Sequence, residues 1–161
     1  MIRALAVIAA AGLVAAGAAT AGPPADQTLY GNIASVKPDG NRYLLRIDPA
    51  FWLGGLTASK ASAEDGFGSQ VDNDYYIRDE GHKLLTYVLP KTARVTVLVS
   101  RTASGNQSPI GSARVPVTEF VQLLAGKNPK HRKLLGKPTD FGYWVTVHID
   151  TVRALAAQYR P

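Results

Sequence analysis

The segment TLYGNIASVKPDGNRYLLRID, residues 28–48, gives the most direct indication of the fold. Its first part, 28–36, is composed of residues that suit a strand. Proline and glycine within 37–41 have the spacing of a tight turn. Residues 42–48 then alternate between apolar and charged side chains, which is typical of a half-buried strand. The apolar face of that strand consists of Tyr43, Leu45 and Ile47. The segment therefore predicts a β-hairpin.

A second hairpin is predicted at DYYIRDEGHKLLTYVL, residues 74–89. Two β-prone runs, 74–78 and 82–89, are separated by the three-residue turn 79–81. The turn ends in glycine, which accepts the positive φ angle that tight turns need. Carboxylates at such a turn are expected to be solvated.

The segment between these hairpins, 49–71, is rich in Gly, Ala and Ser and is expected to be a long loop. A short helical turn at 49–54 is the only regular structure that we expect in it. The loop carries the aromatic pair Phe51 and Trp52. This pair either closes the end of a small barrel or offers a stacking surface to a sugar or a base, and the sequence leaves both interpretations open.

The remaining elements follow from periodicity and capping residues. A strand is predicted at 93–100, and a polar loop that can contain a short strand at 101–116. Residues 118–126 predict a helix, with a threonine N-cap and a terminal glycine. Residues 143–149 predict a strand, and 151–160 predict a last helix, since its apolar residues recur at helical spacing.

Short antiparallel strands with one helix inserted before the last strand predict an α+β fold that is mostly β. We expect a small, partly open antiparallel barrel, similar in layout to the OB-fold, with the inserted helix and a C-terminal helix. An α+β sandwich with the helices on one face is the alternative.

The N-terminus has the pattern of a secretory signal peptide. Arg3 precedes an apolar run that extends to about Ala19, and small residues occupy the positions that a signal peptidase recognises. The run falls short of the roughly 20 strongly apolar residues of a spanning helix. An uncleaved anchor is the alternative. We expect cleavage after Ala21, and we expect no other membrane segment.

The cleaved chain is expected to comprise a lead-in without regular structure at 22–27 and one β-rich domain at 28–161. Loss of Arg3 lowers the formal net charge from +6 to +5. The chain contains no cysteine, so the core of the exported domain has no disulfide to stabilise it. We expect a secreted protein or one located in the periplasm or cell envelope.

The chain resembles a group of small exported bacterial proteins of unknown function, in which a leader precedes one β-rich domain. The resemblance rests on four segments that together span much of the expected domain: DPAFWLGGLTASKASAEDG (48–66), NDYYIRDEGHKLLTYVLP (73–90), ARVTVLV (93–99) and IDTVRALAAQYRP (149–161). It implies a single exported domain. It implies no catalytic or binding residue, because the group has no established activity.

Half of the carboxylates fall within seventeen residues: Glu64, Asp65, Asp72, Asp74, Asp79 and Glu80. The simplest interpretation is a solvated loop and turn. Two carboxylates across a groove could instead hydrolyse an envelope glycan, together with His82 or His148. A third interpretation is weak calcium binding by oxygen ligands at 72–74. We predict no catalytic residue, no metal site and no cofactor, because the sequence contains no nucleophile elbow, phosphate-binding loop or histidine pair at metal spacing.

Cations dominate the segment from Gly81 to Lys137, where only Glu119 opposes ten lysines and arginines. The densest part is 127–137, and we expect an anionic ligand to bind there through Lys127, Lys130, Arg132, Lys133 and Lys137. Specific nucleic-acid binding is not expected, because aromatic residues are not interleaved with these cations. A solvated cationic loop is the alternative.

A second candidate surface is a cleft formed by Phe51, Trp52, Trp144 and His148. Trp144 and His148 lie on one face of the predicted strand 143–149, opposite its valines. We therefore predict an exported, non-catalytic domain that binds an anionic envelope polymer or lipid headgroups through a basic face. A glycan or polymer hydrolase and a weak calcium-binding module are the alternatives. The oligomeric state is not predicted.

Overall fold

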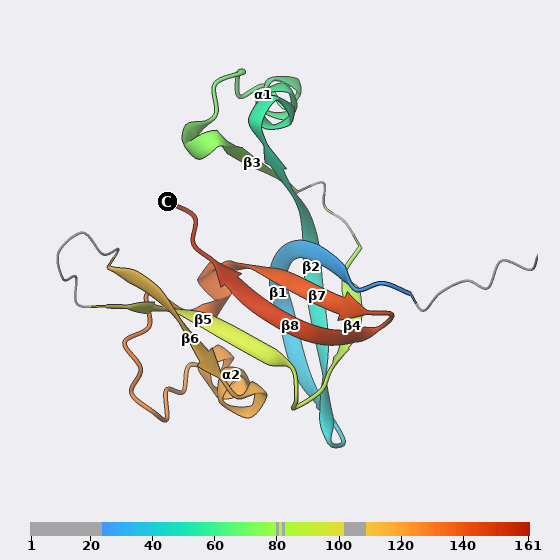
Figure 1. Cartoon of the computed structure of the whole chain (residues 1–161), viewed down its shortest axis with the longest axis vertical. Helices are drawn as coiled ribbons and strands as arrows, with labels where there is room; N and C mark the ends of the chain where they lie inside the picture. Colours follow the sequence, from blue (N-terminus) through green and yellow to red (C-terminus); the bar gives the residue numbers. More distant parts are fainter. Residues whose placement is uncertain (1–23, 80, 82, 102–108) are drawn as a thin grey trace, which may run out of the picture.

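Strands dominate the architecture, as the sequence predicts (Figure 1). The computed structural model describes residues 24–79, 81, 83–101 and 109–161. The expected signal peptide, residues 1–21, lies outside the described residues, and so do Glu80 and His82.

The described residues form two α-helices and two 3₁₀ turns among eight strands. They are β1 (Gln27–Asp39), β2 (Arg42–Gly54), α1 (Gly55–Glu64), η1 (Asp72–Asp74), β3 (Tyr75–Arg78), β4 (Leu85–Leu89), β5 (Arg94–Ser100), β6 (Ile110–Val115), α2 (Val117–Leu124), η2 (Pro138–Asp140), β7 (Gly142–His148) and β8 (Thr151–Gln158).

The predicted first hairpin is confirmed by the pairing of β1 with β2. The turn places Gly40 at φ 58°, a left-handed conformation that glycine adopts without steric cost. Asp39 and Arg42 flank this turn and form an ion pair at 2.9 Å. Gly31 lies where β1 crosses β2 closely, because a Cβ there would lie 2.4 Å from the carbonyl oxygen of Asp48.

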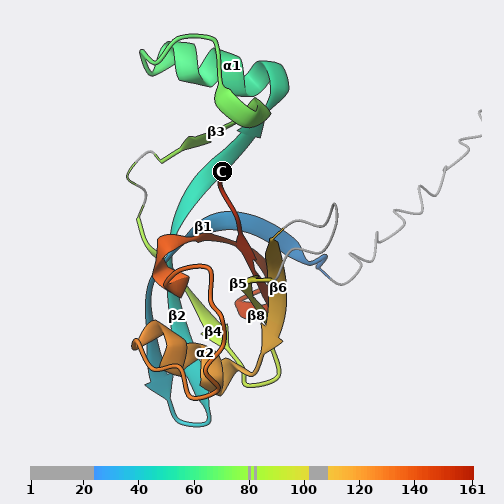
Figure 2. The same ribbon diagram turned by 90° about the vertical axis from the view of Figure 1, so that its left-hand side faces the viewer.

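Five strands close into a barrel, where the sequence predicted a partly open one. Strand β1 pairs with β2 and β7, β2 also pairs with β4, and β7 pairs with β8. The ring closes where Val88 of β4 pairs in parallel with Thr151 of β8. Strand β5 continues the sheet alongside β8, and β6 pairs with β5 (Figure 2).

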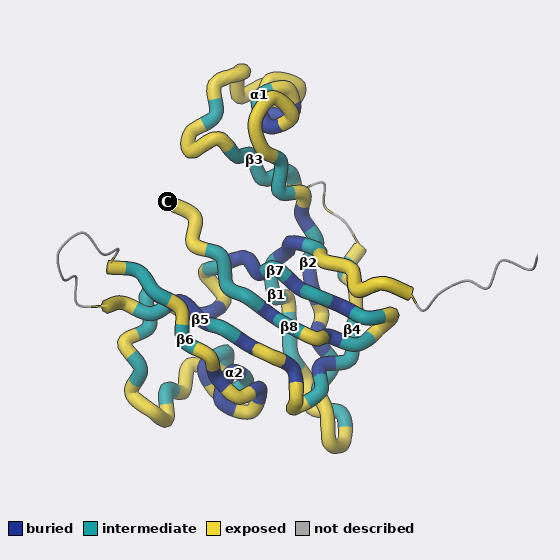
Figure 3. Tube along the Cα trace, viewed as in Figure 1, coloured by how far each residue is buried: buried dark blue, intermediate teal, exposed yellow. Residues whose placement is uncertain are grey.

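The core lies inside the barrel, and buried residues alternate with less buried ones along its strands (Figure 3). Leu45, Ile47, Val145 and Val147 are buried, and Phe120 of α2 is buried with them. Burial of a side chain of this size contributes roughly 1.5–3 kcal/mol. The predicted helix at 118–126 is present as α2, which begins at Val117 and packs its apolar side onto this core.

The predicted second hairpin is wrong, because β3 and β4 both pair with β2 instead of with each other. Strand β2 is 13 residues long. Its first half, from Tyr43 to Ile47, pairs with β4, and its last residues, Phe51–Gly54, pair with β3. A strand of this length offers two separate partners along one edge, which local sequence does not indicate.

The predicted long loop at 49–71 is also corrected. Strand β2 continues to Gly54, and α1 occupies Gly55–Glu64. The end of β2, α1, η1 and β3 project from the barrel as an extension, which we call the arm (residues 51–78), and which Figures 1 and 2 show above the barrel.

The predicted C-terminal helix at 151–160 is wrong, because this segment is β8. The register between β7 and β8 shifts by one residue at Arg153, since Thr146 pairs with Ala154 and Val147 pairs with Val152. A bulge of this kind brings Val152 and Leu155 onto the same side of the strand. Both are buried. Their spacing of three residues imitates the periodicity of a helix.

Candidate functional site

The basic loop (residues 127–137) connects α2 to η2 and lies against β5. Its backbone is attached there by two hydrogen bonds. The amide of Ser100 donates to the carbonyl of Lys133 at 2.8 Å, and the amide of Leu135 donates to the carbonyl of Leu98 at 3.2 Å. Between them, Leu134 forms a bridge with Val99. The cations of the loop are therefore presented from a backbone that is fixed to the sheet.

Asn128 closes a turn within the basic loop. Its Nδ2 donates to the carbonyl of Arg132 at 2.8 Å, and its Oδ1 accepts from the amide of Arg132 at 2.9 Å. His131 within the turn has a φ angle of 48°, which non-glycine residues adopt rarely. The double hydrogen bond offsets this conformational cost.

A buried carboxylate fastens the middle of the basic loop. Glu119 is 4% exposed and lies in the first turn of α2. It accepts hydrogen bonds from Arg132 through both carboxylate oxygens and forms an ion pair with Lys130 at 3.1 Å. The hydrogen bonds from Arg132, followed by those from Lys130, hold the pKa of Glu119 below its ordinary value.

The predicted anion-binding residues thus fall into two groups. Arg132 has an internal partner, and Lys130 shares it while 59% of its side chain stays exposed. Lys127, Lys133 and Lys137 are exposed and form no side-chain ion pair with a described residue. These three lysines are the cations that a ligand can reach most directly.

Two of the predicted cleft residues, Trp52 and Trp144, do meet, and they belong to an aromatic cluster that also contains Tyr30 and Tyr75. Their ring centroids are 5.7 Å apart. Tyr30 lies edge-on to both indoles, with each centroid distance 5.1 Å, and Tyr75 stacks on Trp52 at 4.3 Å. Such aromatic pairs contribute roughly 0.5–1.5 kcal/mol beyond their buried area. The cluster joins the barrel to the arm.

A cavity of about 300 Å³ opens beside the aromatic cluster. It is lined by Tyr30, Trp52 and Trp144, together with Phe51, Thr28 and neighbouring strand residues. Phe51 is 49% exposed at its rim. Pockets for small ligands typically start at roughly this volume and have mainly apolar walls with a few polar groups.

His148 does not line this cavity. Its Nδ1 lies 2.9 Å from Oδ1 of Asp26. These two residues lie two positions beyond the cross-strand pair Thr28–Thr146, on the same face of the sheet. Asp26 belongs to the segment 22–27 that was expected to be an unstructured lead-in, whose last residue, Gln27, begins β1.

The Tyr30 hydroxyl is buried and has no hydrogen-bond partner among the described residues. Its oxygen contacts Gly142, where a Cβ would lie 1.9 Å away. Burial raises the pKa of Tyr30 above its ordinary value. A buried polar group without a partner costs roughly 1–3 kcal/mol.

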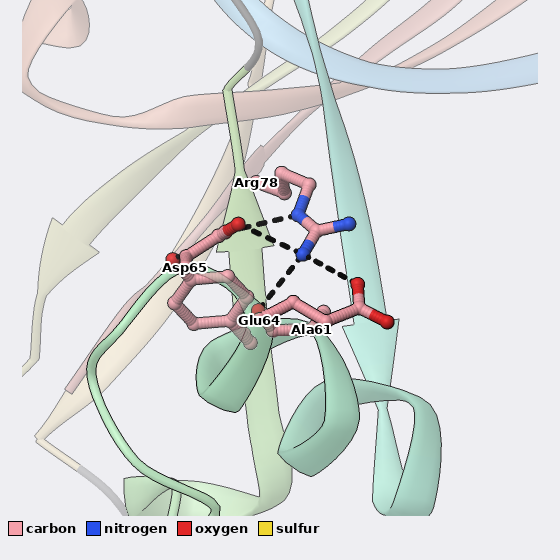
Figure 4. Close-up of polar contacts among 5 residues, drawn as sticks. Ala61, Glu64, Asp65 and Arg78 are labelled. Atoms are coloured by element: carbon pink, nitrogen blue, oxygen red, sulfur yellow. Dashed lines mark hydrogen bonds and ion pairs between the residues drawn. The ribbon is translucent and has the colours of Figure 1, made fainter.

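Four of the clustered carboxylates, Glu64, Asp65, Asp72 and Asp74, lie in the arm, where the first two bind an arginine (Figure 4). Asp65 accepts two hydrogen bonds from the Arg78 guanidinium at 2.9 Å, and Glu64 accepts one at 3.0 Å. Arg78 also donates to the carbonyl of Ala61 in α1 at 2.8 Å, and the Tyr76 hydroxyl donates to Asp65. The Arg78 hydrogen bonds hold the pKa of Asp65 below its ordinary value. These contacts fasten α1 to β3.

Asp72, Asn73 and Asp74 form η1 and are exposed. Asn73 and Asp74 have φ angles of 59° and 56°. Within the described part of the chain, no group of three histidine, aspartate or glutamate side chains is placed to hold a metal ion.

No protein-family model, curated protein or solved structure matches this chain. Among the described residues, no helix has the length and apolar character needed to cross a membrane.

The sequence did not indicate the residues that hold the basic loop and the aromatic cluster in place. Glu119 was considered as the single carboxylate that opposes the cations of 81–137, and its burial in α2 was not predicted. Tyr30 and Tyr75 were treated as strand residues. Their meeting with Trp52 depends on strand pairing between β1, β2 and β3, which no local pattern predicts.

Proposed function

We propose that this protein is an exported, non-catalytic domain that binds an anionic polymer or lipid headgroups of the cell envelope through the basic loop. The single observation that carries the proposal is the way in which the loop is fixed. Glu119 and Asn128 hold its middle, and β5 holds its backbone, while Lys127, Lys133 and Lys137 remain exposed.

Preorganised cations favour binding because less conformational entropy is lost when the ligand arrives. A cationic surface also raises the association rate with polyanions, and this effect weakens with ionic strength. Export is supported by the sequence pattern of residues 1–21 alone.

We also propose that the domain has an OB-like layout. The cyclic pairing of β1, β2, β4, β8 and β7, with α2 between β6 and β7, supports an OB-like layout for the domain. Folds of that layout serve many binding functions, so the layout does not by itself select a ligand.

The hydrolase alternative receives less support from the geometry. Glu64 and Asp65, two of its candidate carboxylates, are engaged with Arg78, and Glu80 and His82 lie outside the described residues. We therefore propose no hydrolytic activity.

The test compares two triple variants of residues 22–161 that lose the same charge. The first changes Lys127, Lys133 and Lys137 to Gln, and the second changes three exposed lysines elsewhere: Lys37, Lys60 and Lys83. Binding to vesicles containing an anionic phospholipid and to polygalacturonate is measured by sedimentation at low and high salt. Two probes are used because a lipid headgroup and a polymer carboxylate offer the same charge chemistry.

We expect the loop variant to bind roughly a hundredfold more weakly at low salt, because each lysine near an anionic surface contributes about 1 kcal/mol. The second variant should lose much less affinity, and high salt should abolish binding of both and of the unmodified domain. Equal loss in the two variants would show attraction by net charge alone, and absence of binding to both probes would refute the proposal.

A further inference from the structure

Three cross-strand pairs follow one another along the outer face of β1 and β7, and we call this row the β1–β7 strip. The pairs are Tyr30 with Trp144, Thr28 with Thr146, and Asp26 with His148. The opposite face of β7 points into the core, where Val145 and Val147 are buried.

Along the strip, the side chains change from aromatic to hydroxyl-bearing and then to ionisable. It begins with aromatic rings, continues with two hydroxyl groups 3.4 Å apart, and ends with an imidazole and a carboxylate 2.9 Å apart. Thr28, Thr146 and His148 are exposed or half-buried, so their polar atoms face solvent beside the cavity of about 300 Å³.

We propose that this cavity and the β1–β7 strip form a binding site for a neutral saccharide. A sugar ring has an apolar C–H face, which suits the aromatic walls provided by Phe51, Trp52 and Trp144. It also has a rim of hydroxyl groups, which can donate to and accept from the two threonine hydroxyls and can donate to the Asp26 carboxylate. Apolar walls with a few polar groups at one end give a sugar both affinity and orientation.

The lining of the cavity favours a neutral ligand. None of the described residues that line it carries a charge. At the far end of the strip, the imidazole of His148 lies 2.9 Å from the Asp26 carboxylate, so no isolated cation faces an anionic ligand there. A nucleic-acid segment would need cations for its phosphates. The exposed lysines of the basic loop belong to a different set of elements, so this site is independent of the proposed function.

The tryptophans make the site directly measurable. The chain contains two tryptophans, and both line this cavity. Intrinsic tryptophan fluorescence therefore reports on this site without any label. The experiment titrates the domain, residues 22–161, with neutral oligosaccharides of glucose, N-acetylglucosamine, mannose or galactose up to millimolar concentrations, and calorimetry provides a second readout.

We expect a saturable change in emission with at least one saccharide, and a dissociation constant that does not change with salt. Phe51→Ala should weaken that binding roughly tenfold, because it truncates an aromatic wall of the pocket. The matched control is Phe67→Ala, since Phe67 is 75% exposed in the arm and does not line the cavity. The control should bind like the unmodified domain, and circular dichroism should show that both variants are folded before their binding is compared.

Thr28→Val tests the polar end of the site without changing its shape, and it should weaken binding by several-fold while aromatic contacts persist. The proposal is overturned if no saccharide changes the emission and none gives heat. It is also overturned if Phe51→Ala and Phe67→Ala bind equally well, or if polyadenylate or polygalacturonate, titrated in the same way, binds while no neutral saccharide does. If saccharide binding disappears when Lys127, Lys133 and Lys137 are changed to Gln, the ligand binds at the basic loop and not in this cavity.

Discussion

Replacement of Glu119 by glutamine tests the main anchor of the basic loop. The change keeps the shape of the side chain and removes the charge that Arg132 and Lys130 face. Hydrogen bonds to a charged group contribute about 1.5–3 kcal/mol, whereas an exposed pair such as that with Lys130 contributes about 0–1 kcal/mol. Removing one partner of a fully buried pair costs roughly 3–5 kcal/mol.

The Arg132 side chain is 23% exposed, so water compensates part of this loss. We therefore expect Glu119→Gln to lower the free energy of unfolding by about 2 kcal/mol at neutral pH. In a domain of this size the melting temperature should fall by roughly 8 °C.

The effect of Glu119→Gln on the free energy of unfolding should depend on pH, and the lowered pKa of Glu119 determines the direction of this dependence. The folded-state pKa of Glu119 is lowered, so its contribution to stability is complete above the unfolded pKa, about 4.3. It is lost as the pH falls through the lower, folded pKa. The difference in unfolding free energy between the unmodified domain and Glu119→Gln should therefore be constant near neutrality and shrink on acidification below about pH 4.

The assay is urea unfolding followed by circular dichroism at several pH values. Glu64→Gln is the matched control, because Glu64 also pairs with an arginine but is 52% exposed, and it should change stability little. The double variant Glu119→Gln with Arg132→Gln should recover part of the loss. A Glu119→Gln protein as stable as the unmodified domain, or a difference that persists unchanged at acidic pH, would refute this account of the anchor.

Three further predictions concern the packing of the barrel and the arm. Tyr30→Phe removes a hydroxyl without a partner among the described residues and should raise the unfolding free energy by about 1 kcal/mol; a lower value in urea unfolding would indicate that the hydroxyl has a partner. Gly142→Ala should lower it by about 1–3 kcal/mol, because the new Cβ would meet the Tyr30 ring, and unchanged stability would contradict this close packing. Arg78→Lys removes the planar fork that binds Asp65 and should speed amide exchange in α1 while exchange in the barrel stays slow; equal exchange in α1 would mean that the ion pairs do not fasten the arm.

The sequence predicted the elements whose signals are local. The hairpin at 28–48 has its turn residues and its alternating face in one segment, and the structure confirms it. Helix α2 is similar, because its apolar side repeats at helical spacing within eight residues. Both depend on contacts between residues that are close in the chain.

The errors occur where distant segments decide the structure. Residues 151–158 contain alanines and a three-residue apolar spacing, both of which favour a helix, yet pairing with β7 and β5 makes them a strand. The bulge at Arg153 produces the misleading spacing. Strands β3 and β4 have clear β propensity, but their shared partner β2 is visible only in three dimensions.

For the candidate surfaces, too, features that are local in the sequence could be predicted, and features that depend on contacts between distant segments could not. The cations of the basic loop are close together in the sequence, so their clustering could be predicted, although the burial of Glu119 and its pairing with Arg132 and Lys130 could not. Phe51 and Trp52 were linked to Trp144 only by residue type, and the structure places them around one cavity. His148 lies beyond that cavity because it is two pairs further along β7.

The connectivity of the barrel has a consequence for the order in which the chain folds. The ion pair of Arg78 with Asp65 joins residues 13 positions apart, whereas Thr28 meets Thr146 across 118 positions. Contacts between distant residues form slowly because a long loop must close first. The arm can thus fold before the C-terminal strands pair, and the barrel closes last. Until β7 arrives, β1 presents an unpaired edge to other chains, and the incomplete polypeptide is exposed to aggregation during this interval.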